Sequence, residues 1–118
     1  GKILSSAQTT DDGILAWLSV TKKGLEKFNV DTEDTHAFIN NLLILDNVKV
    51  ACMFRELPEG EGQVKVRLRS IGNIDVGILA NELGGGGHGH AAAVILQGQI
   101  DILIRETISK LHHFISQK

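Results

Sequence analysis

The sequence predicts a single α/β domain in which helices flank a mixed sheet of four to five strands. Three observations support this prediction: apolar or alternating runs of strand length, longer stretches with apolar residues at helical spacing, and the resulting order β-α-β-β-α-β-α. Strands joined through a helix can be parallel, whereas strands joined by a short turn are antiparallel. The length of 118 residues and a hydrophobic content of 42% suit one domain with a core.

The first strand is expected after a short polar arm. Residues 1–12 are polar and small and are interpreted as a linker or arm, which leaves 13–118 as the domain. The apolar run Ile14–Val20 has the length and composition of a buried strand. A polar connection over Thr21–Asn29 follows it.

The first helix is expected to begin at Asp31–Asp34, which offers a capping side chain and acidic residues for the first turn. Apolar residues then recur at helical spacing, so this helix should bury Phe38, Leu42 and Leu45. We expect it to end near Asp46–Asn47.

The next two strands are expected to form an antiparallel hairpin. Val48–Glu56 is interpreted as a strand, Leu57–Gly62 has the composition of a turn, and Gln63–Ser70 alternates strictly between apolar and polar residues. Side chains of a strand alternate between its two faces. The alternation therefore places Val64, Val66 and Leu68 on one face, and Lys65, Arg67 and Arg69 on the other.

The second half predicts a helix, a short strand and a terminal helix. Asn73 is expected to cap a helix over Asp75–Leu83, and Gly84 to end it at the C-cap. Val94–Gln97 is interpreted as a strand and Gln99–Ser116 as a helix. The expected buried residues are Val76, Leu79 and Leu83 in the first helix, and Ile100, Ile104, Ile108, Leu111 and Ile115 in the second.

Composition narrows the classes of function. A net charge of −2 gives no global attraction to nucleic acid, so any such binding requires a local patch. Cys52 is the single cysteine, which argues against a disulfide scaffold and for a reducing compartment. The apolar runs are too short to span a bilayer, so we expect a cytoplasmic domain without a membrane partner. Tyrosine is absent and aromatic residues make up 4%, which disfavours a base-stacking platform.

The segment Gly84–Ala93, GGGGHGHAAA, is the strongest candidate for a binding site. It satisfies G-x-G-x-x-G, but a dinucleotide motif leaves a strand and opens a helix, whereas this one follows a helix. Successive N–H groups of a glycine-rich turn can form an anion-binding concavity. The alternative is a flexible connection between a helix and a strand. Because His88 follows the glycines, the sequence favours the anion-binding turn and the flexible connection about equally.

The cationic side of Gln63–Ser70 is the second candidate. A solvated sheet face would explain Lys65, Arg67 and Arg69 taken alone. However, one short helix connects this strand to the glycine run, so Arg69 and Ser70 can lie near it. Arginine binds phosphate bidentately, and a serine hydroxyl can join it. Together, the two features predict a phosphate-rich ligand.

The remaining histidines and acids carry no strong prediction. His88-x-His90 and His112-His113 are candidate metal ligands, but no cysteine or carboxylate joins them at a recognised spacing. We expect His36, His90, His112 and His113 at the surface, and assign only His88 a role, as a hydrogen-bond donor to a phosphate oxygen. Capping and solvation explain Asp11, Asp12, Asp31, Glu33 and Asp34, and no nucleophile–base pair is evident.

Residues Gly85–Ala92 resemble the GGGHxxAA signature of the DHH-associated domain, the C-terminal lobe of DHH-family phosphoesterases. Arg67–Ser70 is similar to the arginine–serine strand ending of that family, and Gly13–Trp17 to the start of its first strand. The resemblance extends from Gly13 to the C-terminus. One departure is Ala93, where the family usually has glycine.

The resemblance implies one lobe of a two-lobed hydrolase, most similar to the branch of nano-RNases that dephosphorylate 3′-phosphoadenosine 5′-phosphate. The N-terminal DHH lobe of the same parent chain would carry the manganese ions and the catalytic residues, so neither a metal nor a catalytic residue is assigned here. The expected ligand is a short oligonucleotide or a nucleotide phosphate. The implied binding residues are Arg67, Arg69, Ser70, Gly85, Gly86, Gly87, His88 and Ala91.

Two other functions stay open. Related lobes terminate some alanyl-tRNA synthetases, so a non-catalytic nucleic-acid-binding module is the alternative; it should bind structured RNA with a steep salt dependence. A packing or dimerisation lobe ranks last because the apolar residues are explained as core. The sequence does not decide whether the domain forms a homodimer.

Overall fold

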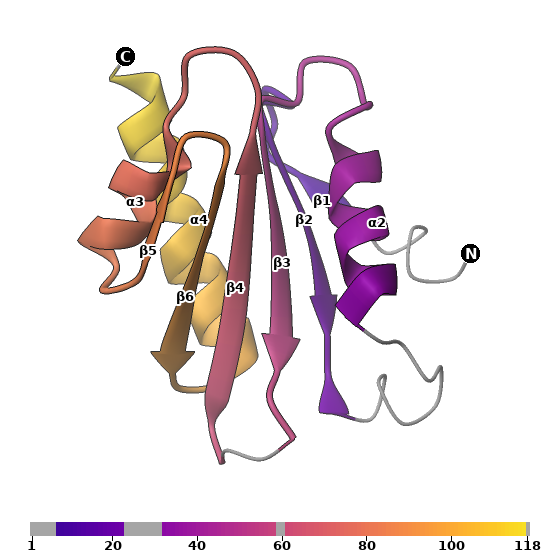
Figure 1. Ribbon diagram of the computed structural model, residues 1–118, viewed down its shortest axis with the longest axis vertical. Helices are drawn as coiled ribbons and strands as arrows, with labels where there is room; N and C mark the ends of the chain where they lie inside the picture. The colour runs from indigo at the N-terminus through magenta and orange to yellow at the C-terminus, as the bar shows by residue number, and fades with distance from the viewer. Residues whose placement is uncertain (1–6, 23–31, 59–60, 118) are drawn as a thin grey trace.

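Six strands form one mixed sheet in the computed structural model, in the order β1-β2-β3-β4-β6-β5 (Figure 1). The structure describes residues 7–22, 32–58 and 61–117. The strands are β1 Gln8–Thr9, β2 Leu15–Val20, β3 Val50–Glu56, β4 Gln63–Ser70, β5 Gly86–His88 and β6 Ala91–Gln97. The helices are α2 Thr32–Leu42, α3 Val76–Glu82 and α4 Ile100–Ser116.

The pairing confirms a mixed sheet. Strands β2 and β3 are parallel, as expected for strands joined through a helix, and β3 and β4 form the predicted antiparallel hairpin. Strand β4 also pairs with β6, and β6 with β5, both antiparallel. The expected number of strands was too low, because β1 lies within the predicted arm and β5 within the predicted glycine loop.

The side chains of β1 and β5, the two strands that the sequence did not predict, give little indication of a strand. β1 contains two residues, and its backbone pairs with β2 at the edge of the sheet. β5 consists of two glycines and a histidine, which sequence patterns assign to a turn because glycine is depleted in strands. Its backbone nevertheless pairs with Ala91–Ala93, so β6 begins three residues earlier than expected.

The two faces of the sheet are covered differently. On one face, α3 and α4 pack over a core that includes Phe54 and the apolar side of β4. On the other face, α2 packs against β2 and β3 through Ile39 and Leu42. Among the helices that the structure describes, Figure 1 shows α2 over this side of the sheet at β2 and β3, and none over the same side of β4 and β6. The uncovered half is where the polar side of β4 lies.

Two helix boundaries differ from the expectation. α2 ends at Leu42 rather than near Asp46–Asn47, because the following residues form tight turns and Asn47 has a φ of 70°. Consequently Leu45, which was expected to be buried, is 46% exposed, and Ile39 is buried instead. The predicted start of this helix at Asp31 and the connection over 23–31 lie outside the described residues.

The α3 helix has a clear cap at each end. The carboxylate of Asp75, rather than Asn73, caps the start by accepting a hydrogen bond of 2.8 Å from the Gly77 N–H. At the end, Gly84 adopts φ +94°, one residue beyond the C-cap Leu83, and the Gly85 N–H bonds back to Ala80. This is the Schellman arrangement, which favours glycine because of its left-handed backbone.

Strand β5 packs against its neighbours so closely that side chains are excluded. A Cβ on Gly77 of α3 would lie 2.7 Å from the Cα of His88. A Cβ on Gly87 would lie 2.5 Å from the Cα of Ala92, and a Cβ on Gly85 would lie 2.5 Å from the Cβ of Val94. These glycines allow α3, β5 and β6 to make backbone contact.

We predict that Gly77→Ala lowers the free energy of unfolding by about 1–3 kcal/mol, because its methyl group overpacks the α3–β5 contact. Helix propensity alone predicts the opposite sign, a gain of up to about 1 kcal/mol. Gly86→Ala is the matched control, because nothing lies within 4 Å of its Cβ position. Urea unfolding of both variants measures the difference; equal stability would contradict the packing argument.

Candidate phosphate-binding face

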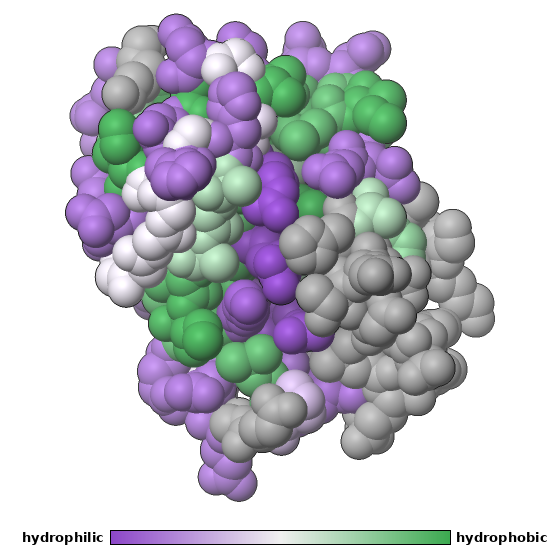
Figure 2. All heavy atoms as spheres, viewed as in Figure 1, coloured by the Kyte–Doolittle hydropathy of each residue, from purple (hydrophilic) through white to green (hydrophobic). Residues whose placement is uncertain are grey.

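The polar side of β4 lies on the uncovered half of the sheet. Val64, Val66 and Leu68 are buried toward α3 and α4, whereas Lys65, Arg67 and Arg69 are half-exposed, which confirms the predicted alternation. Their neighbours on β6 are Ile95, Ala93 and Ala91. We call these six residues, together with Arg55 of β3 beside Lys65, the cationic face. Figure 2 shows a hydrophilic band along the middle of this side of the molecule, over β4.

Sequence reasoning missed a fourth cation at this face. Arg55 is the register partner of Lys65 in β3. Paired residues of neighbouring strands project to the same side of a sheet, so the Arg55 side chain joins the cations of β4. The signal was present in the alternation of β3, but only the strand register shows that Arg55 lies opposite Lys65.

The cations at this face perturb one another. Proximity of Arg67, together with burial and Arg55, lowers the pKa of Lys65. Burial, followed by Arg55 and Arg69, lowers the pKa of Arg67. Within the described residues, no carboxylate forms an ion pair with Arg55, Lys65 or Arg67. The face therefore carries a local positive charge although the chain has a net charge of −2.

Strand register brings the glycine–histidine segment to the same face. His88 pairs with Ala91, and Ala91 pairs with Arg69, so the three residues form one row across the sheet. Gly86, Ala93 and Arg67 form the next row. The exposed imidazole and the arginines are thus separated only by alanines, which leave room above the sheet.

Hydrogen bonds hold the turn between β5 and β6 in place. The Gly89 carbonyl accepts from the Val76 N–H at 3.0 Å, and the His90 carbonyl accepts from the Ser70 N–H at 3.1 Å. The His90 ring contacts the Gly72 carbonyl at 2.7 Å, and because a carbonyl only accepts, Nε2 donates. The structure therefore supports an ordered turn over a flexible connection.

Ser70 does not join this face. It is 4% exposed on the opposite side of β4, and its hydroxyl donates to the Ile74 carbonyl at 2.6 Å. Gly85 lies just before β5 and Gly87 lies within it, and close packing accounts for the absence of a side chain at both positions. Arg67, Arg69, Ala91, Gly86 and His88 are the predicted site residues that the structure brings together.

Neither the backbone conformation nor the packing of the described residues requires a glycine at position 86. Among the glycines that the structure describes, it alone combines an ordinary φ with nothing within 4 Å of its Cβ position. It lies in the row of Arg67, with open space above it. An approaching ligand would fill the space that a side chain here would take.

Comparison with protein-family models identifies the family of this domain. The model of the DHHA1 domain matches residues 13–117 of this chain. The chain belongs to the DHHA1 domain family. This domain occurs in DHH-family phosphoesterases, as the resemblance of residues 85–92 indicated. The narrower assignment to the nano-RNase branch is not tested by this match.

Two solved structures share the fold of this DHHA1 domain. An exopolyphosphatase-related protein from Bacteroides fragilis has 30% identity and a TM-score of 0.81 over 99% of this chain. A pGpG-specific phosphodiesterase, PggH from Vibrio cholerae, has 11% identity and a TM-score of 0.64 over 99% of this chain, a likeness of fold alone. The domain covers 33% and 38% of those two chains. Comparison with curated proteins finds no match.

Among the hollows of the described surface, two lie near the candidate residues or the sheet edge. One, of about 440 Å³, lies between α3 and β5 and is lined partly by Asp75, Glu82, Gly86 and His88, so it borders the end of the row that carries the imidazole. Its carboxylates disfavour a phosphate group. The other, of about 570 Å³, lies between α4 and the β1–β2 edge and is lined partly by Trp17 and Arg105. Neither is lined by the arginines of β4, so the cationic face remains the candidate phosphate site.

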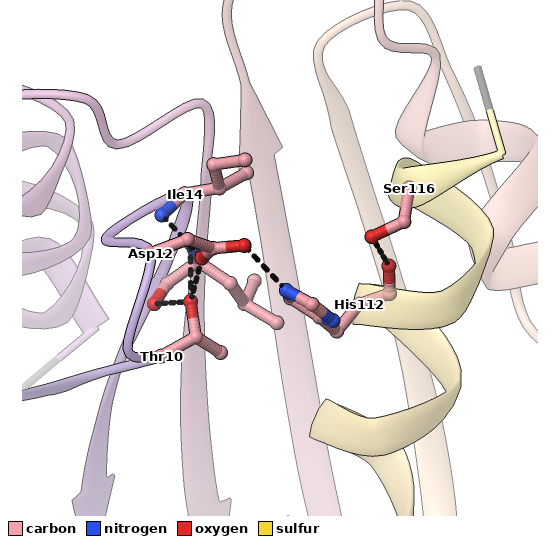
Figure 3. A network of polar contacts seen from close by, with 6 residues as sticks. Thr10, Asp12, Ile14, His112 and Ser116 are labelled. Carbon is pink, nitrogen blue, oxygen red and sulfur yellow. Dashed lines mark hydrogen bonds and ion pairs between the residues drawn. The ribbon is translucent and has the colours of Figure 1, made fainter.

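A second polar cluster links the β1–β2 turn to α4 (Figure 3). The Asp12 carboxylate accepts from the Thr10 hydroxyl at 2.7 Å, the Ile14 N–H at 3.1 Å and His112 Nε2 at 2.7 Å. These hydrogen bonds lower the pKa of Asp12 to about 2, with Thr10 as the largest cause. The cluster fastens the edge of the sheet to the terminal helix, which gives His112 a structural role.

The domain offers no evident metal centre in its described part. Among the side chains that the structure describes, no group of three or more His, Cys, Asp or Glu could hold a metal ion. The Asp12–His112 pair lacks a third ligand of this kind. Of the helices that the structure describes, none has the length and apolar content to cross a bilayer.

We predict that Asp12→Asn reduces the loss of stability on acidification. A carboxyl group whose pKa falls from 3.8 to about 2 on folding stabilises the native state above pH 4, and this contribution is lost as the pH falls toward 2. Thermal unfolding at pH 5 and at pH 2 should therefore differ less in the variant. Asp11→Asn, at the exposed neighbouring position, is the control and should retain the wild-type difference.

Proposed function

We propose that this DHHA1 domain binds the phosphate end of a short oligonucleotide or a nucleotide phosphate on its cationic face, as the substrate-binding lobe of a DHH-family phosphoesterase. One observation carries the proposal: strand register aligns His88, Gly86, Arg67 and Arg69 around an uncovered floor of alanines. Arginine, imidazole and open backbone are the groups that bind phosphate oxygens.

Each side chain has a distinct task in this proposal. Arg67 and Arg69 neutralise phosphate charge, and Arg67 lies where burial strengthens its electrostatic interactions. His88 donates a hydrogen bond to a phosphate oxygen from the neighbouring strand. Gly86 allows the ligand to approach the backbone of β5. Ser70 supports the site through its hydrogen bond to the Ile74 carbonyl, not by touching the ligand.

The domain contributes binding and orientation in this proposal, not bond cleavage. Holding a phosphate ester in a fixed position and neutralising its charge lowers the barrier for a reaction that other groups complete. The manganese ions implied by the resemblance would belong to the DHH lobe, because the described residues here lack a suitable donor set. The nano-RNase type, acting on short oligoribonucleotides or on 3′-phosphoadenosine 5′-phosphate, is the branch that we favour.

We predict that His88→Ala weakens binding of adenosine 3′,5′-bisphosphate by about tenfold, the typical effect of losing one charge-assisted hydrogen bond. Isothermal titration calorimetry at two salt concentrations measures the change. His113→Ala is the matched control, since His113 is an exposed histidine of α4, behind the sheet. If transfer RNA binds more tightly than the bisphosphate and both histidine variants behave like wild type, the nucleic-acid-binding alternative is correct instead.

We further predict that Gly86→Val weakens binding of the same bisphosphate while the domain stays folded. A side chain at this position projects into open space and not into the chain, so it obstructs the ligand only. Calorimetry gives the affinity, and urea unfolding verifies that stability is retained. Unchanged affinity in the folded variant would place the ligand elsewhere.

A further inference from the structure

We infer that the hollow between α4 and the β1–β2 edge is a separate binding site, which takes a small aromatic carboxylate. The hollow has a volume of about 570 Å³, which is within the range of small-molecule sites in proteins. Trp17 and Ile104 line it, and both pack against the core that α4 covers. The hollow therefore lies on the opposite side of the sheet from the cationic face, so a ligand in it would not touch Arg67.

The floor of the hollow is apolar, and the chain covers it only in part. Ile108 is 8% exposed and belongs to the core, whereas Trp17 and Ile104 are half-buried. An aromatic ring placed here would remove this apolar surface from water. Contact between the ring and the Trp17 indole would add to that gain, because aromatic pairs attract each other beyond the area that they bury.

Donor groups without partners lie along one side of this floor. Arg105, Ser109 and His112 are spaced by four and three residues, so they share one face of α4. Among the described residues, no carboxylate forms an ion pair with Arg105, and the Ser109 hydroxyl makes no hydrogen bond. A guanidinium and a hydroxyl are groups from which a carboxylate accepts hydrogen bonds.

The charge around the hollow favours a ligand with one negative charge. Of the described side chains that line it, none is Asp or Glu, and Arg105 carries a permanent charge. Asp101, which precedes Arg105 by one turn of α4, lines the adjoining hollow with Ser19. One arginine matches one carboxylate, whereas a phosphate ester carries more charge and needs more donors. The apolar floor and the single cation together favour an aromatic monocarboxylate.

Hydrogen bonds fix the two walls of the hollow relative to each other (Figure 3). Thr10 belongs to the β1–β2 wall, and His112 belongs to the α4 wall. Both donate to the Asp12 carboxylate, at 2.7 Å each, which joins the walls at this point. A site that is held open in this way loses less conformational freedom when a ligand binds.

Two probes that differ in one functional group test the inference. 3-Phenylpropionate carries a carboxylate, and 3-phenylpropionamide has the same ring without the charge. Trp17 is the single tryptophan of the chain, so its indole N–H resonance in NMR spectra reports on the hollow directly. We expect the carboxylate to shift this resonance saturably and to bind about tenfold more tightly than the amide, the effect of one charge-assisted hydrogen bond.

Variants of α4 locate the carboxylate of the probe. Arg105→Gln should weaken binding of 3-phenylpropionate about tenfold and leave binding of the amide unchanged, whereas Arg105→Lys should retain most of the affinity. Lys110→Gln is the matched control, because Lys110 is an exposed cation of the same helix that lines a different hollow, between α3 and α4. Equal losses in the two glutamine variants would show an effect of net charge and overturn the site.

Three other results would overturn the inference as well. The first is a Trp17 resonance that does not shift saturably, and the second is an amide that binds as tightly as the carboxylate. The third is a loss of probe binding in Arg67→Gln, which would place the probe on the cationic face. None of these measurements uses a nucleotide, so this inference and the proposed function stand or fall separately.

Discussion

Strand β4 has one face in the apolar core and the other toward solvent, and the arrangement of the other elements follows from this constraint. Its apolar residues belong to the core under α3 and α4, so its polar residues must face the other way. That other face can hold three charged side chains only where no helix covers it. Helix α2 packs on β2 and β3, which leaves the cations of β4 at the border between a covered and an uncovered half of the sheet.

The glycine-rich segment has a second role besides the one that its sequence suggests. Gly85 and Gly87, together with Gly77 of α3, permit backbone contacts that a side chain would prevent. These contacts place β5 beside β6 and so bring His88 into the row of Arg69. The segment is thus a structural element that positions a histidine. Gly86 is the member whose absence of a side chain the packing does not explain, which is why the proposed function places the approach of the ligand there.

Much of the candidate site could be predicted from local patterns. The strict alternation of Gln63–Ser70 indicated which face carries Arg67 and Arg69, and the glycine–histidine motif indicated a family that residues 13–117 match. The number of strands was underestimated because β5 is held by backbone pairing and lacks apolar side chains. Arg55 was missed because its partner depends on strand register, and Ser70 was grouped with Arg69 although neighbours in a strand face opposite ways.

The sequence by itself determined the identity of the strands with strong alternation, the cationic side of β4, the helices with apolar stripes, and the family resemblance. These features depend on local periodicity, which can be recognised from consecutive residues alone. Only the tertiary structure decided which rows of residues become neighbours, because register and strand order result from packing across the whole domain. The same packing leaves the α2 side of β4 and β6 without a helix among the described elements, so the row of charges lies at the surface, as the proposed binding site requires.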